Sequence, residues 1–145
     1  MQWVHLSPHF PPNFYLFANR FRQRGGKVLG ITDQSIQQLR PELRESLHDH
    51  EPVNSLHNET EVLEAVDRLI SRNGKIDLVE SHLEPWLPLE AKIRQVFNIV
   101  GAQPSEIEGI QQKSRMKDIF RQAGALVVEG EILRSLEQGI DFITK

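Results

Sequence analysis

Two glutamates follow a short apolar segment in the middle of the chain. Residues 76–79 are predicted to form a buried strand, and Glu80 and Glu84 come directly after it. Open α/β sheets bind ligands beyond the carboxyl ends of their strands. The two carboxylates are therefore candidates for contact with a polar substrate. The competing interpretation is that Glu84 caps the helix that begins at Pro85 and that Glu80 is solvated.

Cationic side chains gather further along the chain, where a helix is expected over residues 111–123. They are Lys113, Arg115, Lys117 and Arg121. Lys113 lies near the expected start of that helix, where free backbone N–H groups reinforce an anion site. Lys113 is therefore a candidate phosphate-binding residue. A solvated cationic face is the ordinary interpretation of the other three.

Several common chemical sites have no signature in this sequence. There are no cysteines, so a thiolate nucleophile and a cysteine metal site are excluded. His48 and His50 stand in an acidic turn without further ligands, and only His82, near Glu84, is close to the proposed site. The segment SPHFPPN lacks the glycines that a dinucleotide-binding turn requires, and no P-loop is present. We assign no catalytic residue and no metal ligand.

Length and composition indicate a small globular protein that is not adapted to bind nucleic acid or an anionic membrane. A chain of 145 residues is about one domain, and 39% hydrophobic with 26% charged residues is typical of a folded globular protein. The net charge of -3 gives no general attraction to nucleic acid or to an anionic membrane. The first residues, MQWVHLSPHFPP, resemble neither a signal peptide nor a membrane span. We expect a cytoplasmic protein with no nucleic-acid or membrane partner.

The elements that must position the candidate residues alternate between strand and helix. Strands are predicted over residues 2–6, 27–32, 52–56 and 76–79, with residues 48–51 as a polar turn. Helices are predicted over residues 14–24 with Asn13 as cap, over 35–47 with a break at Pro41, from Asn58 to Gly74, and after Pro85. The apolar faces expected for the first and last of these helices are Leu16, Phe17 and Phe21, and Leu89, Ile93, Val96 and Phe97. The fold class is therefore predicted as α/β, with an open, mainly parallel Rossmann-like sheet and helices on both faces.

The composition changes after Gly101. Residues 102–109 are predicted to be a linker, followed by a helix over 111–123, a strand over 125–128 and a helix over 131–143. The first of these two helices is expected to bury Met116, Ile119, Phe120 and Ala123. One strand with two helices cannot bury its own faces. We expect one domain over residues 1–103 and, over 104–145, a linker with the incomplete start of a second. Its uncovered apolar faces favour association, for example into a homodimer.

The segment DLVESHLEPWLPLEAKIRQVFNIVG followed by KSRMKDIFRQAG, preceded by a strand, helix and strand ending in GITD, resembles the N-terminal part of ATP-grasp ligases. That part comprises the preATP-grasp domain seen in biotin carboxylase and in carboxylate–amine ligases, and the start of the ATP-grasp domain. The resemblance implies that Lys113 contacts nucleotide phosphates. It also implies that Ser7, Asn13 and the region of Glu84 line the acceptor-substrate side, beside Glu80. Such enzymes use ATP and magnesium to convert a carboxylate into an acyl phosphate, which an amine then captures.

The chain also departs from this pattern. The second lysine that contacts ATP, the adenine-binding hinge and the magnesium ligands of the family would all lie beyond Lys145. We therefore expect ATP, magnesium, the carboxylate and the amine to bind in a full-length parent, and these 145 residues alone to be inactive with no tightly bound cofactor. The alternative is a non-catalytic Rossmann-like module that binds a small molecule or a partner chain.

Overall fold

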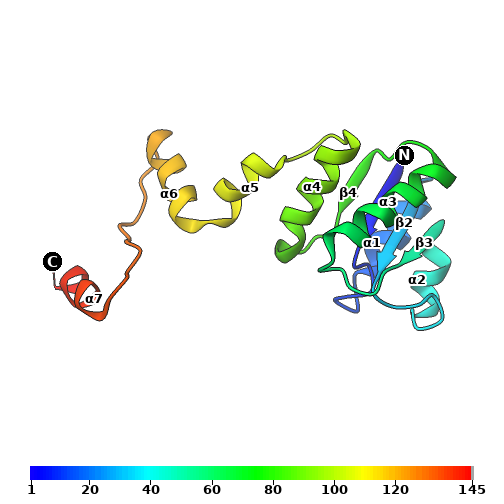
Figure 1. Ribbon diagram of the computed structural model, residues 1–145, viewed down its shortest axis with the longest axis horizontal. Coiled ribbons are helices and arrows are strands. Elements are labelled where there is room, and N and C mark those ends of the chain that lie inside the picture. The colour runs from blue at the N-terminus through cyan, green and yellow to red at the C-terminus, as the bar shows by residue number, and fades with distance from the viewer. Residues whose placement is uncertain (145) are drawn as a thin grey trace. The chain divides into compact units, whose positions relative to one another are not determined.

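A four-stranded, all-parallel sheet forms the centre of the first part of the chain, residues 1–104 (Figure 1). The computed structural model describes residues 1–144, so Lys145, the last residue of the predicted second domain, lies outside the described residues. The strands are β1 (Gln2–Leu6), β2 (Lys27–Thr32), β3 (Asp49–Pro52) and β4 (Leu78–Glu80), in the order β3-β2-β1-β4. In the register, Val4 lies opposite Leu29 of β2 and opposite Val79 of β4. The α/β class and the parallel sheet predicted from the sequence are confirmed.

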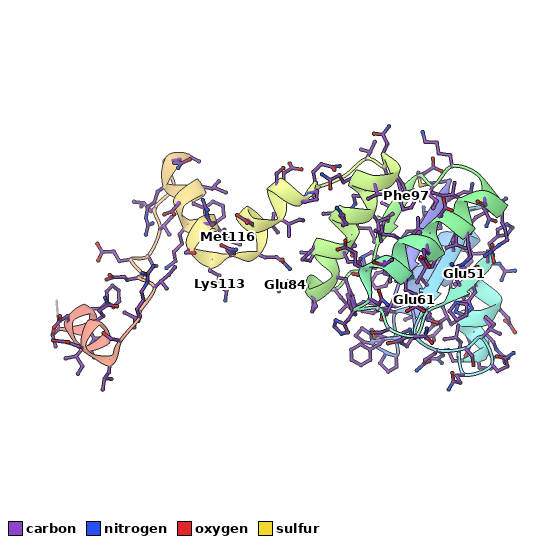
Figure 2. All side chains as sticks on the ribbon, in the orientation of Figure 1. Glu51, Glu61, Glu84, Phe97, Lys113 and Met116 are labelled. Atoms are coloured by element: carbon purple, nitrogen blue, oxygen red, sulfur yellow. The ribbon has the colours of Figure 1, made fainter. Side chains whose placement is uncertain are left out.

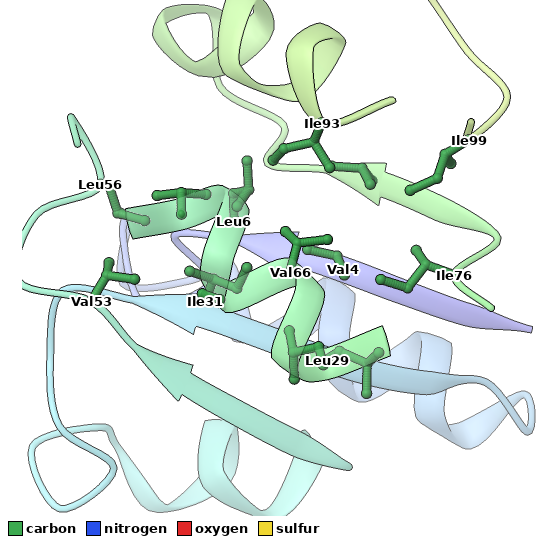
Figure 3. Packing of buried hydrophobic residues seen from close by; sticks show 14 residues of the cluster. Val4, Leu6, Leu29, Ile31, Val53, Leu56, Val66, Ile76, Ile93 and Ile99 are labelled. Atoms are coloured by element: carbon green, nitrogen blue, oxygen red, sulfur yellow. The ribbon is translucent and has the colours of Figure 1, made fainter. Parts of the chain in front are cut away.

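Helices cover both faces of the sheet. They are α1 (Tyr15–Gln23), α2 (Pro41–Ser46), α3 (Glu59–Asn73), the short 3-10 helix η1 (Glu84–Trp86) and α4 (Leu87–Phe97). Successive strand residues point to opposite faces, so Val4 packs with Val66 of α3 and Ile93 of α4 (Figure 3). Its neighbour Trp3 packs on the other face with Ala18 of α1. Each face of the sheet therefore has its own apolar layer.

Helix α3 has the capping that its sequence predicts. The Asn58 side chain accepts a hydrogen bond from the Glu61 N–H at 3.3 Å, which satisfies one of the free donors of the first turn. The helix ends at Gly74, whose φ of 81° is readily adopted only by glycine. Val62 and Val66, one helical turn apart on α3, are fully buried.

The third strand lies earlier in the chain than predicted. The sequence favours a strand over residues 52–56, but β3 includes the polar segment 49–51 that was predicted to be a turn. The strand tolerates its charges because helix α3 neutralises them. Arg72 Nε lies 2.9 Å from Asp49 Oδ2 and Arg72 Nη1 lies 2.6 Å from Glu51 Oε1, while Arg68 Nε lies 2.8 Å from Glu51 Oε2.

The apolar faces predicted for two helices are partly wrong. In α1 the N-cap position is Phe14 and no side chain caps the helix, so Asn13 does not cap it. Ala18 is the buried residue of α1 and packs with Trp3 of the sheet, whereas Leu16 and Phe17 lie outside this cluster and are 47% and 46% exposed. In α4, Val96 of the predicted apolar face is 49% exposed, and buried Glu90 and Arg94 take part of the inward face.

The chain divides into two compact units, Met1–Pro104 and a second that begins at Ser105. The predicted linker is mostly the helix α5 (Pro104–Gln111), which proline can start because its fixed φ suits the first helical turn. Helices α6 (Lys113–Gln122) and α7 (Leu136–Ile143) follow, and the segment 125–128 predicted as a strand is not one. Without a strand in the described part of this unit to pack on, Ile119 and Phe120 of the predicted buried face are 49% and 47% exposed.

Within residues 1–144, no helix combines the length and the apolar character that crossing a membrane requires.

Candidate functional site

The loops that follow the four strands meet around one cavity of about 390 Å³ in the first unit. It lies beyond the carboxyl ends of the strands, next to the point where the chain order reverses between β1 and β4. Parallel sheets characteristically bind ligands at such a point. We call this space the carboxyl-edge cavity; it is lined by Ser7, His9, Phe10, Asp33, Leu56, His57, Leu83, Pro85 and Trp86.

A histidine and a carboxylate form the polar part of the carboxyl-edge cavity. His9 Nε2 lies 3.1 Å from Asp33 Oδ1, and the two side chains are 14% and 41% exposed. Burial lowers the pKa of His9, although the neighbouring Asp33 carboxylate opposes that shift. A neutral His9 whose Nε2–H donates to Asp33 leaves the negative charge of the carboxylate uncompensated. The pair can therefore attract a positively charged group.

Apolar side chains form the rest of the cavity wall. Phe10 is 60% exposed and follows β1, while Leu83 and Trp86 come from the segment after β4. The rings of Trp86 and His57 lie with their centroids 4.8 Å apart. This wall offers flat aromatic surfaces to the apolar part of a ligand.

Ser7 shapes the first loop of the cavity. Its φ of 54° is uncommon for a residue other than glycine. The Ser7 N–H donates to the Ile31 carbonyl at 3.0 Å, and the Ser7 carbonyl accepts from the Phe10 N–H at 3.2 Å. The first bond extends the pairing of β1 with β2, and the second closes the turn that carries His9 and Phe10.

A buried ion network supports the other side of the cavity. Arg94 Nη2 lies 2.9 Å from Glu90 Oε2 and 3.0 Å from Glu80 Oε1, and it donates to the Val79 carbonyl at 2.6 Å. Glu90 is fully buried and Arg94 is 3% exposed. Burial and the nearby Glu90 raise the pKa of Glu80, although Arg94 opposes the shift.

Glu90 also fixes the loop that leads from β4 to the cavity. Its Oε1 accepts hydrogen bonds from the Ser81 N–H, at 2.7 Å, and from the Ser81 hydroxyl. Ser81 Oγ in turn accepts from the Leu83 N–H at 3.0 Å. Because Leu83 lines the cavity, Glu90 and Arg94 act on the site through the backbone that they hold.

A cluster of aromatic rings forms around β1; it consists of Trp3, His5, Phe17 and His82. The buried ring of His5 stacks on Trp3 with centroids 4.1 Å apart, and within the described structure neither of its nitrogens has a hydrogen-bond partner. Burial, with smaller contributions from His82 and His9, lowers the pKa of His5 to about 3. The ring of His82, which the sequence pairs with Glu84, lies 4.3 Å from that of Phe17. His82 is thus one ring of this aromatic cluster.

The candidate residues from the sequence lie in different places. Ser7 lines the carboxyl-edge cavity, and Glu84 begins η1 between the lining residues Leu83 and Pro85. Asn13 is exposed in the turn before α1 and is not among the described lining residues. Glu80 is held by Arg94 as described above. Lys113 belongs to the second unit, where it is the first residue of α6 (Figure 2).

Lys113 lines a separate cavity of about 450 Å³ within the second unit. Ser114, Lys117 and Gly130 also line it. A Cβ added at Gly130 would lie 2.5 Å from Lys117 Nζ, so the lysine approaches the bare backbone closely. Within residues 1–144 no group of three or more His, Cys, Asp or Glu side chains is placed to hold a metal ion.

Sequence reasoning missed the polar pair of the carboxyl-edge cavity. Asp33 had one available signal, because it directly follows the second predicted strand, at the same edge as Glu80. His9 had none, because its partner is 24 positions away and only the turn at Ser7 brings the two together. Glu90 and Arg94 are one helical turn apart, but that spacing is also common on exposed surfaces.

Three solved structures resemble this chain over nearly its whole length. An L-amino acid ligase from Bacillus licheniformis superposes with a TM-score of 0.69 at 20% identity, covering 94% of this chain and 33% of that chain. A phosphoribosylglycinamide synthetase from Anaerococcus prevotii gives 0.70 at 14% identity, covering 99% and 34%. The biotin carboxylase domain of a single-chain bacterial carboxylase gives 0.63 at 14% identity, covering 99% and 34%.

All three of these proteins are ATP-grasp enzymes. No protein-family model and no curated protein matches the sequence. The chain spans about one third of the length of each solved structure. It therefore has the fold of a portion of an ATP-grasp enzyme.

Proposed function

We propose that this chain is the N-terminal, substrate-side part of an ATP-grasp ligase that joins a carboxylate to an amine through an acyl phosphate. The observation that supports this most is the superposition of 94–99% of the chain on three ATP-grasp enzymes. In this proposal the carboxyl-edge cavity lies on the acceptor side, with Ser7 in its wall and Glu84 beside it. Glu80 and Asn13 are proposed to contact the substrate from outside the wall of that cavity. The substrates are small molecules, and we expect the enzyme to act in the cytoplasm.

Lys113 is proposed to contact the phosphates of ATP. The cavity that it lines contains a second cation, Lys117, together with Ser114, the exposed backbone of Gly130 and one carboxylate, Glu131. Lys113 is also the first residue of a helix of 10 residues, whose first-turn N–H groups favour anions. These groups fit phosphate oxygens. When bound, ATP supplies the phosphoryl group that activates the carboxylate.

Magnesium does not fit the described residues in the same way. Metal-assisted phosphoryl transfer uses carboxylates to hold the ion against the phosphates, and no suitable group of three or more side chains occurs within residues 1–144. We therefore propose no step that runs through a metal on this chain. Because electrostatic stabilisation is usually the largest catalytic contribution, the chain alone is expected to release no ADP from ATP.

A chimeric enzyme tests the proposal. The part of the Bacillus licheniformis ligase that superposes on this chain would be replaced by this chain, and ADP release would be measured with mixtures of carboxylates and amines. We expect ADP release that requires both substrates. A chimera that melts cooperatively and binds ATP, but releases no ADP with any pair, would contradict the proposal.

The same chimera tests the role of Lys113. Changing Lys113→Ala removes a charge-assisted contact to a phosphate, so kcat/KM for ATP is expected to fall about ten- to hundredfold. Arg134→Ala, an exposed cation of the same unit that is not among the described lining residues of the Lys113 cavity, serves as the control. Equal effects of the two changes on kcat/KM for ATP would show that Lys113 does not contact the phosphates.

The second candidate function is a non-catalytic module that binds a small molecule or a partner chain. One observation favours it: every described residue that lines the carboxyl-edge cavity belongs to the first unit. Such a cavity could bind a ligand without the remaining parts of a ligase. Ligand binding by the chain together with an inactive chimera would support this function.

A further inference from the structure

We propose that the carboxyl-edge cavity binds a primary amine that carries an aromatic or branched aliphatic group. The ammonium group would lie at Asp33, and the apolar group against Phe10 and Trp86. The inference rests on the proposed function only for the role of this ligand. In that role the ammonium group would lose a proton to water, and its nitrogen would then form the amide bond with the acyl carbon as inorganic phosphate leaves.

The charge of the cavity favours a cation over an anion. Among its described lining residues Asp33 is the one acid, and none is Lys or Arg. The next cation along the chain, Arg40, directly precedes α2 and is already engaged, because its guanidinium pairs with Glu42 at 3.1 Å and donates to the Pro12 carbonyl at 3.0 Å. A carboxylate ligand would therefore meet the negative charge of Asp33 without a compensating cation from the wall.

The geometry of Asp33 leaves its carboxylate within reach of a ligand. Its Oδ1 is held by His9 Nε2 at 3.1 Å, which limits the orientations of the side chain. The side chain is nevertheless 41% exposed, whereas that of His9 is 14% exposed. An oriented and accessible carboxylate can accept a charge-assisted hydrogen bond from an ammonium group.

The size and the wall of the cavity indicate the rest of the ligand. A volume of about 390 Å³ lies in the usual range for small-molecule sites. Phe10 and Trp86 offer aromatic faces, and Leu56, Leu83 and Pro85 add aliphatic surface. Aromatic faces also attract ammonium groups. A small, purely polar amine would leave this surface uncovered.

Three matched probes test the proposal on the full chain. Phenethylamine, 3-phenylpropionate and 2-phenylethanol carry the same ring with a cationic, an anionic and a neutral end. Each would be titrated into the ¹⁵N-labelled protein at neutral pH, and chemical shifts would be followed by NMR. We expect phenethylamine to shift the signals of Ser7, His9, Asp33 and the Trp86 indole, with a Kd about tenfold or more below those of the other two probes.

Variants of the same protein identify the group that selects the amine. Asp33→Asn is expected to weaken phenethylamine binding about tenfold and to abolish its advantage over 2-phenylethanol. Asp67→Asn removes the same charge from an exposed position on α3 and is expected to change nothing. Phe10→Ala, at a side chain that is 60% exposed, is expected to weaken all three probes alike.

Several results would overturn the proposal. They are equal binding of the three probes, no binding of phenethylamine, unchanged binding by Asp33→Asn, and shifts confined to residues outside the cavity. These results are distinct from failure of the ligase proposal. An inactive chimera with selective amine binding would reject the ligase alone, whereas an active chimera without amine selectivity would reject the amine site alone.

Discussion

At the scale of single residues, the first unit contains buried ionisable side chains that ordinary cores avoid. His5, Glu90 and Arg94 are each at most 3% exposed. Burying such groups costs free energy unless they are neutral or paired. His5 meets that condition by staying neutral, and Glu90 meets it through Arg94 and Ser81. Each solution has a measurable consequence.

The pKa of His5 predicts a loss of stability in acid. The pKa lies near 3 in the folded protein against 6.5 for a free histidine, so between these values the unfolded state binds more protons. Stability is therefore complete above pH 6.5 and falls as the pH decreases toward 3, by up to about 1.4 kcal/mol per pH unit from this residue. His5→Phe keeps a ring against Trp3 but removes the titration. We expect urea unfolding from pH 6.5 to about pH 4 to show a shallower dependence for this variant.

The control for this experiment is His48→Phe, because His48 is exposed in the loop before β3. This variant makes the same substitution at an exposed site. Parallel stability curves for wild type and His5→Phe would mean that His5 is protonated in the folded protein.

Arg94 is expected to be the most sensitive charged residue of the first unit. Arg94→Met leaves Glu90 buried without its cation, and breaking a buried pair in this way costs about 3–5 kcal/mol. Arg68→Met is the matched control, because its pair with Glu51 involves a guanidinium that is 45% exposed and is worth about 1 kcal/mol or less. The double change Glu90→Gln with Arg94→Met should recover part of the loss. Similar losses of unfolding free energy for Arg94→Met and Arg68→Met, measured by urea unfolding, would contradict the assignment of a stabilising buried ion network.

These residues also show the limit of sequence reasoning about the site. Glu84 could be assigned to the carboxyl edge because it follows a predicted strand, and Ser7 because the resemblance to ATP-grasp ligases implies a substrate-side loop there. The pairing of His9 with Asp33, and of Glu80 with Arg94, depends on which strands are neighbours and on the turn at Ser7. Neither is encoded in local spacing.

At the scale of elements, two asparagines that were expected near helix starts differ in whether they cap the helix. Asn58 caps α3 through its side chain, whereas Asn13 precedes a helix without a side-chain cap. The sequence already separates them in part, because a glutamate, Glu61, follows Asn58 three positions on, whereas Leu16 follows Asn13. The difference arises because the prolines of residues 8–12 lead into a turn that places Phe14 at the N-cap of α1.

Alanine substitutions make this difference measurable. Asn58→Ala is expected to lower the free energy of unfolding by about 1 kcal/mol, because the Glu61 N–H loses its acceptor. Asn13→Ala is expected to change it by less than about 0.5 kcal/mol. Denaturant unfolding of both variants in parallel provides the measurement. A larger effect at Asn13 than at Asn58 would show that the cap of α1 has been assigned wrongly.

Strand β3 shows why some strands were predicted less accurately than others. Strands β1 and β2 match their predicted ranges because both are continuous apolar segments buried on two faces. Strand β3 lies at the edge of the sheet, where carboxylates can reach the arginines of α3. Its polar sequence therefore resembles a turn, and only the partner helix explains it.

At the scale of the whole molecule, the two units differ in how completely they bury their apolar side chains. The first unit has two apolar layers on one sheet. In the second unit, Leu126 and Val128 are almost fully exposed, at 104% and 82%. Sequence reasoning anticipated that the predicted tail could not bury its own faces, although it expected a strand there. Since the chain spans about one third of each similar structure, we propose that further parts of a ligase cover these side chains.

The most direct test of the account combines the chimera with the residue that is proposed to select the amine. In the chimeric ligase, KM for an aralkyl amine and KM for ATP would be measured with and without Asp33→Asn. We expect the change to raise KM for the amine about tenfold and to leave KM for ATP unchanged. Unchanged values for both substrates, or a change in KM for ATP alone, would contradict the claim that the carboxyl-edge cavity holds the acceptor of an ATP-grasp ligase.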